Sequence, residues 1–170
     1  MADFCFVKEK IIDIEGGYSN NKYDLGKETK YGISKKSFPD LDIVNLTKED
    51  ALLIYKSHYW DKYKFFNIIN QYIADVIFLS TINIPSATFK SVQKSINYFI
   101  ETHNENLDPL VVDGVMGDKT FFYINSSSLD KFLFINRFKI EMINYYMSIS
   151  QNSTIQSKNF LGWVRRVLSY

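Results

Sequence analysis

Three side chains near the start of the chain carry the groups that acid–base chemistry at a polar bond requires. Glu15 ends an apolar, helix-like segment, and Gly16-Gly17 follow it directly. Asp24 stands nine residues further on, and Thr29 stands five residues beyond Asp24, in a region rich in Gly and Asn. A carboxylic acid, a second carboxylate and a hydroxyl that holds water together suit the hydrolysis of a glycosidic bond.

The position of Glu15 favours the protonated form of its carboxyl group. The partial negative charge at a helix C-terminus disfavours a carboxylate by roughly 0.3–1 kcal/mol at an exposed site. The neighbouring Ile12 and Ile14 indicate partial burial, which also disfavours the charged form. Both effects raise the pKa of a carboxyl group, as a general acid near neutral pH requires.

The spacing alone leaves other interpretations open. In an inverting glycosidase the two carboxyl groups lie roughly 6.5–9.5 Å apart, and a hairpin beside the helix end could place Asp24 at that distance. However, Glu15 is also a normal surface residue before a glycine cap, Asp24 a normal turn residue and Thr29 a normal strand residue. Asp13 and Glu28 are competing carboxylates, although Asp13 points to another side of the helix from Glu15.

The elements that must position these residues can be predicted from the pattern of apolar and turn residues. Residues 3–15 have apolar positions at helical spacing with Asp3 as a plausible N-cap, and Gly and Asn then punctuate a hairpin-rich region over 16–33. The remainder reads as helices. The first is opened by a capping box at Thr47 and Asp50, and two more follow over 68–83, ended by Pro85, and over 86–100. Asp118 is expected to cap a short helix. Ser127 and Asp130 are expected to open a long helix to about 149, and KNFLGWVRRVL forms a closing helix.

The fold class that follows is α+β and mainly α, in one domain over 1–170. A small N-terminal β-hairpin lobe occupies about 16–45, and a larger helical body occupies 1–15 and 46–170. The length of 170 residues, 46% hydrophobic content and 23% charged content are typical of one soluble globular domain.

Composition also limits the classes of function. The net charge of +1 creates no overall positive field that would attract nucleic acid, so we expect no nucleic-acid partner. From Arg137 onward there are five basic residues and one acidic residue, which suits either binding to an anionic polymer or a solvated helix face. The single cysteine, Cys5, excludes an internal disulfide, and we expect a small buried side chain. His58 and His103 lack partners at metal-ligand spacing, so we expect no metal and no cofactor.

The N-terminal sequence has no basic segment, uninterrupted apolar segment or small-residue cleavage site of an export signal. No stretch approaches the roughly 18 apolar residues of a membrane span. We therefore expect synthesis in the cytoplasm without a signal peptide and no membrane insertion. We also expect the protein to be a monomer.

A series of motifs resembles glycoside hydrolase family 108, the lysozyme-like N-acetylmuramidase group also labelled secretion activators. The first is EGGYSN, followed by D-x-G at 24–26 and ETKYGIS. IVNLTKEDALLIYKSHYW, SVQKSIN, VVDGVMGDKT and FLGWVRRV follow in the family's order, so the resemblance runs from about residue 10 to 168. Two departures are Lys27, where the family has glycine, and FLSTINIPS, where it has a glycine-containing turn.

The resemblance implies a lysozyme-like fold and hydrolysis of the β-1,4 bond between N-acetylmuramic acid and N-acetylglucosamine in peptidoglycan. It implies that Glu15 is the catalytic acid, that Asp24 stabilises positive charge at the sugar or activates water, and that Thr29 orients the water. The C-terminal half resembles a helical region of the peptidoglycan-binding type.

Candidate substrate contacts come from the same motifs. Tyr18 and Tyr31 flank the acid and match family positions, and aromatic rings cover the apolar faces of sugars. Tyr59 and Trp60 also match family positions, and they belong either to the core or to the cleft. Gln93 lies on an expected buried helix, where its amide requires partners; it supports either the cleft or only the fold.

Three functions remain in competition at this point. The first is a muramidase that acts on the cell wall after release or delivery, as an endolysin or a delivered lytic enzyme. The second is a lytic transglycosylase, which needs the glutamate but no residue that activates water. The third is a non-catalytic peptidoglycan-binding or assembly module.

Overall fold

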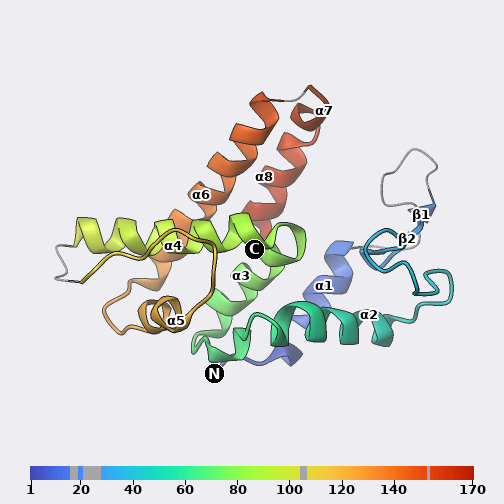
Figure 1. Cartoon of the computed structure of the whole chain (residues 1–170), viewed down its shortest axis with the longest axis horizontal. Helices are drawn as coiled ribbons and strands as arrows, with labels where there is room; N and C mark the ends of the chain where they lie inside the picture. The colour runs from blue at the N-terminus through green and yellow to red at the C-terminus, as the bar shows by residue number, and fades with distance from the viewer. Residues whose placement is uncertain (16–18, 21–27, 104–106, 153) are drawn as a thin grey trace. The chain divides into compact units, whose positions relative to one another are not determined.

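The computed structural model describes residues 1–15, 19–20, 28–103, 107–152 and 154–170, with the backbone alone for 12–15, 19–20 and 154–155. The chain divides into two compact units, coloured along the sequence in Figure 1. One unit comprises Asp3–Lys64, and the other comprises Met1–Ala2 with Phe65–Tyr170.

The Asp3–Lys64 unit begins with two helical segments. A 3-10 turn, η1, covers Phe4–Phe6, and the helix α1 covers Lys8–Glu15. Asp3 caps η1, because its carboxylate accepts a hydrogen bond of 2.8 Å from the backbone N–H of Cys5. In a 3-10 turn residues three apart share a face, so Phe4 and Val7 are buried while Cys5 faces outward. The expectation that Cys5 is buried is therefore wrong.

A three-stranded antiparallel sheet follows, in the order β1-β2-β3. Its strands are β1 (Ser19–Asn20), β2 (Glu28–Lys30) and β3 (Ile33–Ser34). In the register, Ser19 pairs with Thr29 and Thr29 with Ser34, so Thr29 lies at the centre of the sheet.

Two consecutive helical segments complete this unit. The helix α2 covers Lys48–Tyr55 and continues into a π-helical segment, η2, over Lys56–Asp61. Thr47 and Asp50 form the predicted capping box, with both reciprocal hydrogen bonds present. Trp60 is 2% exposed and packs edge-on against Phe4, with ring centroids 5.7 Å apart, so it belongs to the core of this unit.

All regular secondary structure in the described residues of the Phe65–Tyr170 unit is helical, and loops join the helices. Its segments are η3 (Phe65–Asn67), α3 (Gln71–Asn83), α4 (Pro85–Thr102), α5 (Asp118–Ile124), α6 (Lys131–Gln151), α7 (Thr154–Ser157) and α8 (Phe160–Ser169). The long helix α6 packs against α4 and against α8, which runs beside it in Figure 1. Ile96, Phe134, Phe138 and Met142 are buried in its core.

The predicted helix signals in this unit are confirmed in part. The helix α3 ends before Pro85, which then stands at the first position of α4, where its missing N–H costs nothing. Two capping predictions are wrong. The N-cap of α5 is Gly117, with Asp118 as the first helical residue, and Asp130 alone caps α6 through the N–H of Leu133.

The architecture confirms the predicted α+β, mainly helical, lysozyme-like class. Helices make up most of the described chain, and one small antiparallel sheet stands near its N-terminus. Among the described residues, no helix is both long and apolar enough to cross a membrane.

Candidate active site

Glu15 is the last residue of α1, where the sequence predicts that the helix ends. The carboxyl group therefore belongs to the residue at the negative end of the helix dipole. The side chain of Glu15, and the whole of Tyr18 and Asp24, lie outside the described residues.

Thr29 occupies the middle strand of the sheet and is partly exposed. Residues paired directly across antiparallel strands point to the same face, so the hydroxyl groups of Thr29 and Ser34 share one face of the sheet. The hydroxyl of Ser34 is 3.0 Å from that of Ser37 and accepts a hydrogen bond of 3.2 Å from the N–H of Ser37. Glu28 precedes Thr29 in the strand and points to the opposite face, which separates this competing carboxylate from Thr29.

A strained two-residue turn joins β2 to β3 directly after Lys30. Lys30 pairs with Ile33, so the turn consists of Tyr31 and Gly32, which have φ values of 50° and 73°. Positive φ at both positions is the requirement of a type I′ hairpin turn, which favours Asn and Gly. Gly32 meets this requirement without strain, whereas the side chain of Tyr31 makes the left-handed conformation costly.

The buried residue Tyr55 supports this turn from α2. Its side chain is 1% exposed, and its hydroxyl donates a hydrogen bond of 2.9 Å to the carbonyl oxygen of Tyr31. The sequence motif identifies Tyr55 only as one member of an apolar stripe, because nothing local shows that its hydroxyl has a partner 24 residues earlier.

Two lysines attach the hairpin to the loop that precedes α2. The ammonium of Lys30 donates to the carbonyl oxygen of Val44 at 2.7 Å, and that of Lys35 donates to the carbonyl oxygen of Leu41 at 2.8 Å. The backbone N–H of Lys35 also donates to the carbonyl oxygen of Glu28 at 2.8 Å. These contacts hold both ends of the hairpin, and with it the position of Thr29.

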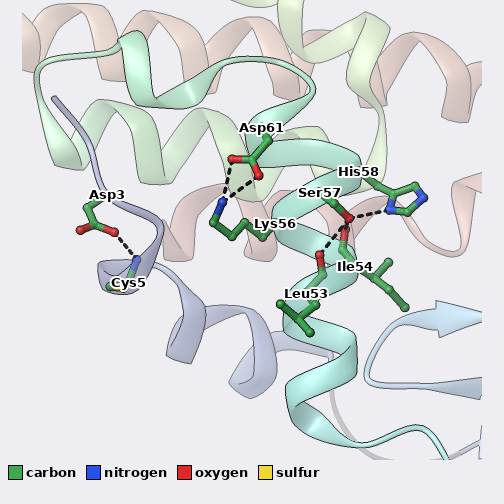
Figure 2. A network of polar contacts seen from close by, with 8 residues as sticks. All are labelled: Asp3, Cys5, Leu53, Ile54, Lys56, Ser57, His58 and Asp61. Carbon is green, nitrogen blue, oxygen red and sulfur yellow. Dashed lines mark hydrogen bonds and ion pairs between the residues drawn. The ribbon is translucent and has the colours of Figure 1, made fainter.

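Figure 2 shows the polar contacts around η2. The hydroxyl of Ser57 lies 2.9 Å from the carbonyl oxygen of Leu53, to which it donates, and 3.0 Å from Nδ1 of His58. The tautomer of His58 determines which of the two groups donates in the second contact. Lys56 and Asp61 form an exposed ion pair at 2.7 Å. In the described parts of the chain, no group of three His, Cys, Asp or Glu side chains is placed to hold a metal ion.

Gln93 belongs to the other unit, where it is 2% exposed on α4. Its Nε2 donates to the carboxylate of Asp113 at 2.6 Å and to the carbonyl oxygen of Val115 at 3.1 Å. Its Oε1 accepts from the N–H of Gly114 at 2.8 Å. The described hydrogen bonds of this amide therefore go to the turn at 113–115. The hydrogen bond from Gln93 to Asp113, together with the one from the N–H of Val115, lowers the pKa of Asp113 below its ordinary value.

The helix that ends on Glu15 and the sheet that contains Thr29 both lie within the part of the chain that resembles a known family. Residues 8–84 match the family model described as Glycosyl hydrolase 108. The match contains Glu15, Thr29, Tyr31 and Tyr55 and confirms the resemblance seen in the sequence.

A solved structure gives independent support for the fold over nearly the whole chain. The structure of Brucella abortus SagA is similar with a TM-score of 0.68 at 20% sequence identity, covering 98% of this chain and 94% of that chain. A comparison with curated proteins finds no match.

Proposed function

We propose that the chain is a muramidase that hydrolyses the β-1,4 bond between N-acetylmuramic acid and N-acetylglucosamine in peptidoglycan. The observation that carries the proposal is the position of Glu15 at the end of α1, inside the segment that matches the glycosyl hydrolase model. A carboxyl group there is disfavoured in its charged form by the helix dipole, which suits a general acid that protonates the leaving oxygen.

In this proposal Asp24 and Thr29 act on the attacking water. Thr29 supplies a hydroxyl from the central strand, and the lysine and tyrosine contacts of the hairpin keep its backbone in place. Asp24 supplies the carboxylate that activates water or stabilises the positive charge that develops at the sugar. Tyr18 and Tyr31 are proposed to contact the sugar rings, and the enzyme acts on the cell wall as an endolysin or a delivered lytic enzyme.

The test compares the wild type with Glu15→Gln on purified peptidoglycan, measured by the loss of turbidity. We expect Glu15→Gln to lose at least about a hundredfold in rate, because removal of a general acid costs about 10²–10⁴. The matched control is Glu9→Gln, which changes an exposed glutamate of the same helix and should keep full activity. Equal clearance by Glu15→Gln and the wild type would show that another residue is the acid.

Mass spectrometry of the released fragments separates the three candidate functions. A muramidase leaves reducing N-acetylmuramic acid ends, whereas a lytic transglycosylase leaves anhydro-muramic ends. A non-catalytic module releases neither product, and its binding to peptidoglycan would be unchanged by Glu15→Gln.

A further inference from the structure

A polar groove lies between α4 and α6 in the Phe65–Tyr170 unit, and the proposed chemistry does not use it. Its volume is about 320 Å³, at the lower end of the range for small-ligand sites. Positions 86, 90 and 94 follow one another at four-residue spacing, so they share one face of α4. The polar side chains that line it include Lys90, Lys94, Glu141, Asn144 and Tyr145, together with three serines.

The turn held by Gln93 also determines the course of Lys90. Gly114 has a φ of 80°, and a Cβ at that position would lie 3.3 Å from Cγ of Lys90. The glycine therefore leaves room for the aliphatic stem of Lys90 to pass close to the turn. Lys90 then lines the groove with its stem packed against a fixed element, and less side-chain freedom remains to be lost on binding.

Each of the two lysines lies near a carboxylate that also interacts with another group of the protein. The carboxylate of Glu141, which is 8% exposed, accepts a hydrogen bond from Arg137, and these two charges compensate each other. The ammonium of Lys94 forms a long ion pair of 3.9 Å with the second oxygen of Glu141, without a hydrogen bond, so a carboxylate of a ligand can compete for it. Asp113 is the nearby carboxylate that faces Lys90, and it already accepts hydrogen bonds from Gln93 and the N–H of Val115.

We propose that this groove binds the acidic peptide attached to a glycan, with a carboxylate of the peptide held by Lys90 and Lys94. Ammonium groups form charge-assisted hydrogen bonds with carboxylates, while Asn144 and Tyr145 offer hydrogen-bonding groups to peptide amides. The inference rests on the proposed function, because in peptidoglycan this ligand is the stem peptide.

Calorimetric titration of the full chain at low salt tests the site with three probes. The first is the disaccharide N-acetylglucosaminyl-N-acetylmuramic acid with its tetrapeptide. The second is the same disaccharide without peptide, which keeps the lactyl carboxylate, and the third is di-N-acetylglucosamine, which has no carboxylate. We expect the peptide-bearing probe to bind most tightly, and its affinity to fall as salt is added.

The variant Lys90→Gln with Lys94→Gln should raise the Kd of the peptide-bearing probe about tenfold, because exposed ion pairs each contribute modestly. The matched control, Lys119→Gln with Lys131→Gln, removes two exposed lysines outside the groove and should bind like the wild type. An unchanged Kd in the groove variant, equal affinity for the disaccharide without peptide, or no binding of any probe would overturn the proposal.

The binding result and the proposed hydrolysis can fail separately. Release of reducing ends by the wild type, together with normal binding by the groove variant, refutes the groove and keeps the muramidase. A tenfold loss of binding in the groove variant, in a chain that releases no reducing ends, supports the groove and refutes the muramidase.

Discussion

The substitution Tyr55→Phe removes one oxygen atom from the interior of the Asp3–Lys64 unit and tests how the hairpin is held. The phenol ring is 1% exposed and its packing is retained by Phe, while the hydrogen bond to the carbonyl oxygen of Tyr31 is lost. Tyr31 has a φ of 50°, a conformation that a tyrosine adopts only when its surroundings enforce it.

The expected loss in the free energy of unfolding is about 1–2 kcal/mol. The hydrogen bond itself contributes about 0.5–1.5 kcal/mol net, and a buried carbonyl left without a partner costs about 1–3 kcal/mol. We expect the cost of the unpaired carbonyl to lie in the lower half of its range, because Tyr31 is partly exposed and water can replace the hydroxyl. Tyr98→Phe, which removes the same atom from a ring that is 44% exposed, should cost less than about 0.5 kcal/mol.

Urea unfolding measures the stability, and turnover of peptidoglycan fragments measures the position of Thr29. If the turn positions Thr29 to hold the attacking water, Tyr55→Phe should lower kcat several-fold. KM should stay within about twofold, because interactions that bind the substrate and the transition state equally are unaffected. Adding Tyr31→Asn, which tolerates positive φ, should recover most of the lost stability in the Tyr55→Phe background. A stability loss without any change in kcat would refute the link between this turn and catalysis.

Three further outcomes are expected. Asp113→Asn should lower the melting temperature at neutral pH, and this loss should shrink as the pH falls below 3.8, whereas Asp108→Asn should have no effect at either pH. The lowered pKa of Asp113 means that its hydrogen bonds stabilise the fold above its ordinary value of 3.8, and this contribution is lost as the pH falls further. Arg165→Glu should weaken co-sedimentation with cell walls at low salt if the basic C-terminal residues bind an anionic polymer, and unchanged co-sedimentation would favour a solvated face. Tyr31→Asn alone should raise the free energy of unfolding by up to about 1 kcal/mol in urea titrations and raise KM if its ring covers a sugar.

The sequence predicts best what depends on neighbouring residues. The capping box of Thr47 and Asp50 and the break before Pro85 are confirmed, since each requires only residues within one helical turn. The N-cap of α6 is missed because Ser127 and Asp130 are both acceptable cap residues, and the path of the chain between them decides the outcome. Cys5 is missed because the prediction rests on the residue type, whereas the 3-10 turn over Phe4–Phe6 leaves its side chain exposed.

Contacts between distant segments are not predictable from residue types alone. The excess of basic residues after Arg137 suggests a charged face, yet three of these residues have intramolecular partners. Arg137 binds Glu141, Arg166 binds Asn83, and Lys139 donates to the carbonyl oxygen of Tyr170 at 2.6 Å, where burial lowers the pKa of its ammonium. Arg165 is therefore the cleaner substitution for testing an anionic partner, because it is exposed on α8.

Tyr31 connects the local strain of the hairpin to the proposed function. Glycine or asparagine would form the same type I′ turn at lower cost, so the turn itself gives no reason for a tyrosine. A residue in a costly conformation persists where its surroundings enforce it, and Tyr55 supplies that support from α2. What the tyrosine adds is its ring, partly exposed two residues after Thr29. The strain therefore favours a role for this ring outside the turn, and a sugar face beside the proposed catalytic residues is the partner that fits its chemistry.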